Sequence, residues 1–174
     1  MKKVGIMLLL GIFQSIYGVT STTGEVDIEF MIKVEEPTSL KKIADIDFGN
    51  LLIGSTGVQQ EKIKGALSIT TLDGVMSNMK LKFSKKKGIQ LNWIDTTPST
   101  PSTGKKRTID NVELIPVGYT FDSSNSIVII GVNTVPKIVE IGATFQAGGI
   151  SGNLISTQEL GKYKGSIRIT GVKI

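Results

Sequence analysis

The stretch from Glu25 to Glu35 alternates between large hydrophobic residues and charged residues, and no other pattern limits the fold of this chain as strongly. Every even position is a large hydrophobe, and every odd position is charged except Met31; the hydrophobes are Val26, Ile28, Phe30, Ile32 and Val34. A β-strand sends alternate side chains to opposite faces, so these five anchors form one apolar edge about 26 Å long at ~3.3 Å per residue. Such a strand has to bury one face, and Pro37 is expected to end it.

The rest of the chain consists of short β-like runs separated by turn residues, with 20 glycines beside many Val, Ile and Thr. This pattern predicts an all-β sandwich. Turns are expected at Gly49-Asn50 and Asp73-Gly74, and at most one helical turn at Ser156 to Glu159. The predicted strands are Val26–Val34, Ile43–Phe48, Ile63–Leu72, Met79–Phe83, Ile89–Ile94, Val112–Phe121, Ile127–Val132, Lys137–Ala147 and Gly165–Thr170.

One low-complexity stretch, Asp95 to Asn111, contains two prolines and is predicted to be a long exposed loop. The same strand pattern flanks it on both sides. We therefore predict one domain from about residue 19 to residue 174, with an N-terminal arm.

The first 18 residues carry Lys2 and Lys3 and then an apolar run from Val4 to Phe13. A basic start followed by a short apolar segment is typical of a secretory signal peptide, and the run is shorter than the ~20 residues that span a bilayer. An uncleaved amphipathic anchor is the alternative. The sequence thus predicts an exported protein with a signal peptide over 1–18.

Composition argues against most kinds of catalysis, because the chain contains neither Cys nor His. Without imidazole or thiolate there is no Ser-His-Asp triad, no Cys-His couple and no zinc ribbon. Acidic pairs such as Asp45 and Asp47 share a strand face but have no opposed partner. We predict no enzyme, no cofactor, no metal and no catalytic residue.

Basic clusters and one tryptophan are the candidate binding features of the sequence. The net charge of +5 falls to about +3 once the two leader lysines are removed, which is too small to predict nucleic-acid binding. Lys85 to Lys87 and Lys105 to Arg107 could attract an anionic polysaccharide, but solvated turns are favoured because no aromatic platform is interleaved with them. Trp93 could stack on a sugar, although burial in the core is favoured.

The two ends of the chain suggest a partner. A five-anchor strand placed directly after a signal peptide could pack in its own sandwich or leave to complete the sheet of another chain. At the other end, Ile167 and Ile169 lie on one face of the last strand. If no neighbour covers that strand, an apolar groove and an unpaired edge remain.

Both ends resemble a known family. The ending STQELGKYKGSIRITGVKI is similar to that of bacterial chaperone-usher pilins, especially the alternate class of colonisation-factor fimbriae and the common pilus. The segment EVDIEFMIKVEEPT resembles the N-terminal donor strand of that class, and KIVEIGATFQAGG and the strand end IDFG also fit. The resemblance covers most of the mature chain in layout, and the lack of Cys suits the alternate class.

The resemblance implies an incomplete immunoglobulin-like β-sandwich with an N-terminal donor strand. Residues 19–36 would be the donor arm and 37–174 the pilin domain. The donor anchors would be Val26, Ile28, Phe30, Ile32 and Val34, and the acceptor groove would be lined by Tyr163, Gly165, Ile167 and Ile169. Gly171 interrupts the alternation and leaves the length of the acceptor strand open.

By the same resemblance, a periplasmic chaperone would lend the missing strand, and at an outer-membrane usher the arm of an identical subunit would replace it. The result would be a cell-surface fimbrium that supports adhesion, with a tip adhesin as a further possible partner. The rival interpretation is a secreted monomeric sandwich that binds carbohydrate or a surface partner through the Asp95–Asn111 loop. An exported hydrolase is a more distant third.

Overall fold

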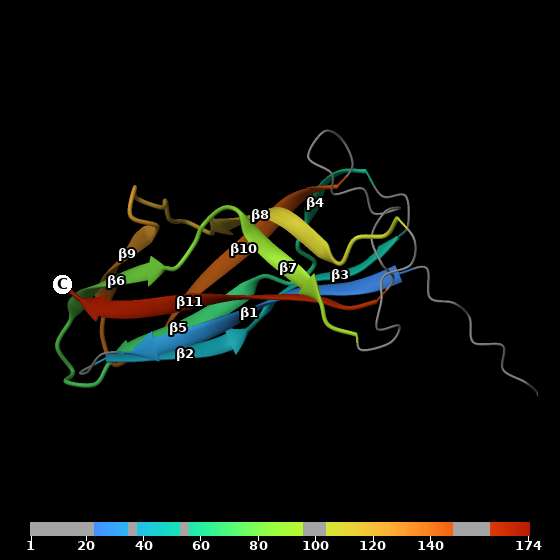
Figure 1. Cartoon of the computed structure of the whole chain (residues 1–174). Helices are drawn as coiled ribbons and strands as arrows, with labels where there is room; N and C mark the ends of the chain where they lie inside the picture. The colour runs from blue at the N-terminus through green and yellow to red at the C-terminus, as the bar shows by residue number, and fades with distance from the viewer. Residues whose placement is uncertain (1–22, 35–37, 53–55, 96–103, 148–160) are drawn as a thin grey trace, which may run out of the picture.

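The computed structural model describes residues 23–34, 38–52, 56–95, 104–147 and 161–174, and every regular element in these ranges is a β-strand (Figure 1). The strands are β1 (Thr23–Val34), β2 (Thr38–Ala44), β3 (Ile46–Leu52), β4 (Gly57–Gln60), β5 (Gly65–Thr71), β6 (Ser77–Phe83), β7 (Ile89–Trp93), β8 (Thr108–Pro116), β9 (Ser126–Val132), β10 (Lys137–Ala147) and β11 (Tyr163–Lys173). The predicted signal peptide, the turn at Ser156 to Glu159 and the middle of the Asp95–Asn111 loop lie outside the described residues.

The strands form two layers that are nearly closed into one sheet. In the first layer β1 lies between β3 and β11, and β6 and β7 follow one another along the other edge of β11. The second layer has β5 between β2 and β10, with β4 also paired to β10. β8 joins the layers, because its first half pairs with β7 and its second half with β10. The predicted all-β, sandwich-like architecture is confirmed at this level.

The core lies between the layers and is built from alternate residues of nearly every long strand. β5 shows the pattern most simply, since its buried and half-buried residues alternate along all seven positions. Two edge-to-face aromatic pairs, Phe48 with Phe145 and Phe83 with Phe121, have ring centroids 5.1 Å apart. Such pairs add about 0.5–1.5 kcal/mol beyond the area they bury.

Several predicted strand limits were wrong. The predicted strand Ile43–Phe48 is divided at Asp45, so β2 joins one layer and β3 the other. Gly49 and Asn50, predicted as a turn, lie within β3, where Gly49 has a φ of 67° beside an irregularity in the β1 pairing. A bulge therefore uses the glycine that the sequence suggested for a turn.

The Asp95–Asn111 region also differs from its prediction. β8 begins at Thr108 and ends at Pro116, so the last four residues of the predicted loop are strand and the predicted strand end at Phe121 is not. At the C-terminus Gly171 does not stop the last strand, because β11 continues to Lys173 and Gly171 pairs with both Val34 and Leu81.

Candidate functional site: the first strand and the groove it fills

The predicted donor strand occupies the interior of its own chain's sheet. β1 runs parallel to β11 with Val26 opposite Tyr163, Phe30 opposite Ile167 and Val34 opposite Gly171. Its other edge is antiparallel to β3 from Thr23 to Ile28. Blue β1 and red β11 can be followed side by side in Figure 1. The last strand is therefore covered on both edges, and the edge that the sequence suggested might be open is occupied by β1.

The alternation along β1 matches its burial wherever side chains are described. Ile28 and Phe30 are buried and Ile32 packs partly buried against the core, whereas Met31 is 44% exposed. The side chains of Val26 and Val34 lie outside the described set, and their register partners alone are known. The described even positions, Ile28, Phe30 and Ile32, thus provide core contacts, and Met31 faces solvent.

All four predicted groove residues, Tyr163, Gly165, Ile167 and Ile169, are buried in β11. The Tyr163 hydroxyl donates to the carbonyl of Lys106 at 3.1 Å, which satisfies its polar end. Gly165 is a close-approach position, since a Cβ there would lie 2.5 Å from Leu91 Cδ2 and 3.0 Å from the Gln90 carbonyl oxygen. This face of β11 is therefore tightly packed against the neighbouring β7.

Two further residues, Gly65 and Asp45, complete the site in roles that the sequence did not predict. A Cβ on Gly65 of β5 would lie 2.5 Å from Phe30 Cζ, so the absence of a side chain leaves room for the middle anchor. Asp45 accepts a hydrogen bond from the Phe30 backbone N–H at 3.0 Å. Because β3 pairs with β1 only as far as Ile28, this carboxylate satisfies a donor just beyond the end of the ladder. The sequence placed Asp45 inside one predicted strand, Ile43–Phe48, and gave no signal for this role.

Charged side chains line the solvent face of the same junction. Glu29 of β1 lies 3.3 Å from the Lys164 ammonium of β11 and 3.8 Å from that of Lys42. The pKa of Lys164 is raised, mainly by its hydrogen bond to Glu29 and then by the charges of Glu29 and Asp27. These exposed pairs contribute little to stability, but they favour the register in which opposite charges meet.

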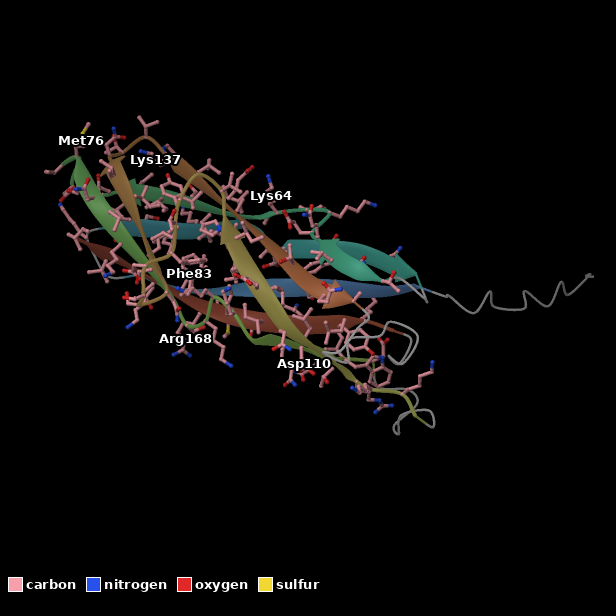
Figure 2. The ribbon with its side chains drawn as sticks, turned by 90° about the horizontal axis from the view of Figure 1, so that it is seen from above. Lys64, Met76, Phe83, Asp110, Lys137 and Arg168 are labelled. Carbon is pink, nitrogen blue, oxygen red and sulfur yellow. The ribbon has the colours of Figure 1, made fainter. Side chains whose placement is uncertain are left out.

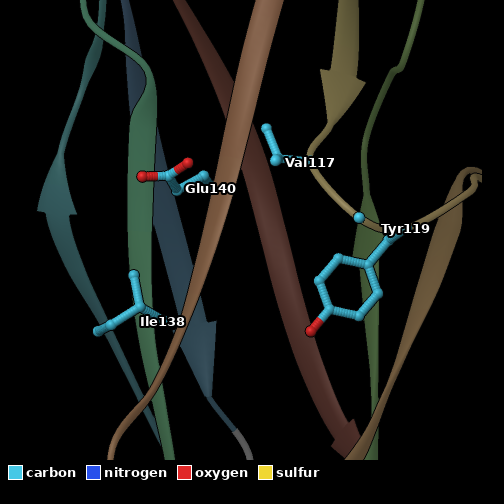
Figure 3. A pocket seen from close by; sticks show the side chains of 5 residues that line it. Val117, Tyr119, Ile138 and Glu140 are labelled. Carbon is cyan, nitrogen blue, oxygen red and sulfur yellow. The ribbon is translucent and has the colours of Figure 1, made fainter.

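The described surface carries shallow hollows, two of which lie beside residues already discussed or near the β8–β10 pair. One, of about 390 Å³, is polar and covers the β1–β11–β7 junction, with Glu29, Asn92 and Ser166 in its lining. The other, of about 410 Å³, is lined by Val117, Gly118, Tyr119, Ile138 and Glu140 (Figure 3). The Glu140 carboxylate is 3.7 Å from the Lys64 ammonium, so the one carboxylate among these lining residues is paired with a lysine that does not line the hollow.

The basic and aromatic candidates are engaged within the protein. The Arg107 guanidinium stacks 3.8 Å above the Trp93 ring, which is half-buried at the edge of the core rather than fully inside it. Lys86 donates to the Asp122 carbonyl at 2.8 Å, and Lys87 pairs with Glu113 at 2.7 Å. Lys86 Nζ also lies 5.9 Å from the centre of the Phe121 ring, so an aromatic residue accompanies each basic triplet, in contrast to the pattern expected from the sequence.

Among the residues that the structure describes, no three acidic side chains gather as metal ligands would. Nor does that part of the chain contain a helix suited to crossing a bilayer. No protein-family model matches the chain, and no curated protein sequence matches it significantly. The site is therefore defined by its own geometry: the first described strand, its inward-facing Ile28 and Phe30, and the face of β11 beside them.

Proposed function

We propose that this chain is the structural subunit of a surface fibre, a shaft-type pilin of the alternate chaperone-usher class that polymerises by donor-strand exchange. In this proposal residues 19–36 are the exchangeable arm of an immunoglobulin-like sandwich that is incomplete without it. The protein is exported, guided by a periplasmic chaperone and an outer-membrane usher, and incorporated head to tail with identical subunits. The fibre supports adhesion of the cell, and the subunit itself is not an enzyme.

The observation that carries the proposal is the position of β1. It is the first described strand, and it is joined to the other described strands only at its C-terminal end. It lies between β11 and β3 and places Ile28 and Phe30 in the core. A strand attached at one end can be replaced by the same strand of another copy without rethreading the chain. Its anchors make it costly to leave the groove empty, at ~1.5–3 kcal/mol for each fully buried side chain.

The direction of the exchanged strand decides what kind of assembly forms. Thr38, at which the arm joins the body, pairs with Thr71 at the end of the molecule where β11 also ends. If the arm enters a neighbour parallel to β11, as β1 does in its own chain, the same end of both subunits meets and a closed two-fold dimer results. If the arm instead enters antiparallel to β11, opposite ends of the two subunits meet, and the series of subunit contacts does not close on itself. A fibre therefore requires the antiparallel direction.

The arm sequence is compatible with both directions. Its even positions are Val26, Ile28, Phe30, Ile32 and Val34, which is the same series from either end with Phe30 in the centre. Reversal about the Phe30–Ile167 pair keeps the largest anchor opposite the same residue of β11. A self-filled monomer and an antiparallel fibre can thus use one set of anchors.

A disulfide staple tests the exchange, because the chain has no native Cys that could interfere. Met31 lies opposite Arg168, both on the solvent side of the β1–β11 pair. Neighbouring strands about 4.8 Å apart are within disulfide reach. The mature chain carrying Met31→Cys and Arg168→Cys should remain monomeric when oxidised before assembly and polymerise after reduction, as measured by sedimentation.

The matched control is Lys82→Cys with Thr170→Cys, which joins β6 to β11 within the body and leaves β1 untouched. This staple should not change the yield of polymer in either redox state. If the β1 staple polymerises as well when oxidised as when reduced, the arm does not need to leave its groove and the proposed function is wrong.

A further inference from the structure

The end of the molecule where β11 finishes exposes an unusual number of large apolar side chains. Among the described residues, six large hydrophobes are more than 60% exposed, and five of them lie at this end: Leu72, Met76, Ile130, Val135 and Ile174, at 61–69%. The sixth, Val58, belongs to β4. We call the group Leu72, Val75, Met76, Ile130, Val135 and Ile174 the apolar pole.

Short-range contacts show that these residues, which come from three separate parts of the chain, form one surface. The backbone N–H of Thr71 donates to the Asn133 carbonyl at 2.9 Å, which joins the β5–β6 loop to the β9–β10 turn. A Cβ on Gly131 would lie 3.8 Å from Met76 Sδ, and the N–H of Ile174 donates to the Asn78 carbonyl at 2.9 Å. Figure 2 shows Met76 and Lys137 close together at this end of the molecule.

Polar groups at the pole are largely satisfied by one another. Lys173 pairs with Asp73 at 2.6 Å, and Lys137 donates to the Ile130 carbonyl at 2.5 Å. The pole therefore offers a partner a mainly apolar surface, on which Asp73 and Lys173 are paired with each other and Lys137 is held by a backbone carbonyl. Monomeric proteins seldom expose contiguous apolar surface of this kind unless it meets a partner.

The arm identifies that partner. Val34 is the last residue of β1 and Thr38 the first of β2, so four peptide steps join the arm to the body, and they span at most about 14 Å when fully extended. Thr38 lies at the apolar pole, paired with Thr71 beside Leu72. When Val34 pairs in the sheet of another subunit, that subunit must lie within this distance of the pole, whichever way the strand runs.

We propose that the apolar pole is the surface on which the subunit that receives this chain's arm packs, so that each junction combines an exchanged strand with a buried apolar contact. This inference rests on the proposed function and adds a second contact to it. The occupant is a second copy of this chain, because the arm brings that copy against the pole. The contact covers side chains that a free monomer leaves in water, and it favours assembly over the self-filled form.

Charge substitutions test the contact without touching the arm or its groove. Met76→Asp and Ile130→Asp each place a carboxylate at the pole, and Ile115→Asp, at a residue 47% exposed on β8, is the matched control. Each pole variant should lower polymer yield by roughly ten- to hundredfold, since a buried apolar contact is replaced by a charge. The control should polymerise as the parent does, and all three monomers should melt within a few degrees of it.

The outcomes separate this inference from the proposed function. If the pole variants polymerise as well as Ile115→Asp while the oxidised β1 staple blocks assembly, the pole is not the contact and the exchange still stands. If the parent and the reduced staple variant form no polymer, the proposed function fails and the inference fails with it. Loss of polymer in all three charge variants would indicate a general charge effect and would also overturn the inference.

Discussion

Gly65 is the residue whose small size matters most to the seating of the first strand. Its φ lies outside the left-handed region, so space rather than backbone strain restricts it. A Cβ would lie 2.5 Å from Phe30 Cζ and 2.8 Å from Ile46 Cγ1. We expect Gly65→Ala to destabilise the monomer by about 1–3 kcal/mol, as overpacking of a dense core does. Urea unfolding of the purified mature chain would measure the loss.

The double variant Gly65→Ala with Phe30→Leu is the control for this contact. Phe30→Leu alone leaves a cavity and lowers stability. In the double variant, the methyl group added at position 65 fills part of that cavity. The combined loss should therefore be smaller than the sum of the two single losses. Additive losses would mean that the Gly65–Phe30 contact does not limit the packing of β1.

The alternation of β1 could be predicted from the sequence, but the residues that contact its buried face and its backbone, Gly65 and Asp45, could not. Period two alone places Ile28 and Phe30 on one face and Met31 on the other, and their burial agrees. The need for Gly65 depends on a ring that arrives from another strand, about 35 positions earlier in the sequence. Asp45 is similar, since its bond to the Phe30 N–H depends on where β3 stops pairing. Local pattern carries no information about either contact.

Among the elements, β1 has the most unusual role, because a terminal strand lies between two others. Removing residues 19–36 would uncover the edges of both β11 and β3, and we expect such a chain to lose cooperative folding when expressed alone. A peptide of residues 23–36 added in trans should restore a thermal transition, followed by circular dichroism. A Met31→Asp peptide should also restore it, whereas a Phe30→Asp peptide should not. Equal rescue by the two variant peptides would contradict the assignment of the inward face.

Strand existence was easier to predict than strand limits. β5, β6, β9 and β10 have strong alternation or long apolar runs and fall close to their predicted positions. β4 was missed because its four residues, Gly57 to Gln60, carry little hydrophobic signal, and it is held by pairing with β10. β11 extends past Gly171 because its pairing with Val34 and Leu81 outweighs the weak strand preference of glycine.

For the molecule as a whole, the parallel placement of β1 against β11 could not be read from the sequence. The hydrophobic pattern specifies which face is buried, but a series that is the same from either end does not specify strand direction. Direction is instead set by connection length: three residues lie between Val34 and Thr38, and Thr38 pairs at the end where β11 finishes. If the same strand is joined to the body at another point, through a linker of another length, it should therefore be able to enter the groove in the opposite direction.

A second copy of residues 23–36, fused after Ile174 through a short flexible linker, tests that freedom. β11 ends at Lys173, so a returning copy would run antiparallel to it and compete with β1 at high effective concentration. If it fills the groove, the native arm is released and residues 19–36 become sensitive to protease.

The fused chain could then donate its arm but not accept one. Mixed at a small fraction into the parent protein, it should end growing polymers and shorten them, as seen by electron microscopy. The same fusion with Asp in place of Phe30 in the second copy should leave polymer length unchanged. A native arm that stays protected, together with polymers of normal length, would mean that the groove accepts only the parallel strand, and the assembly would then be limited to closed dimers rather than open fibres.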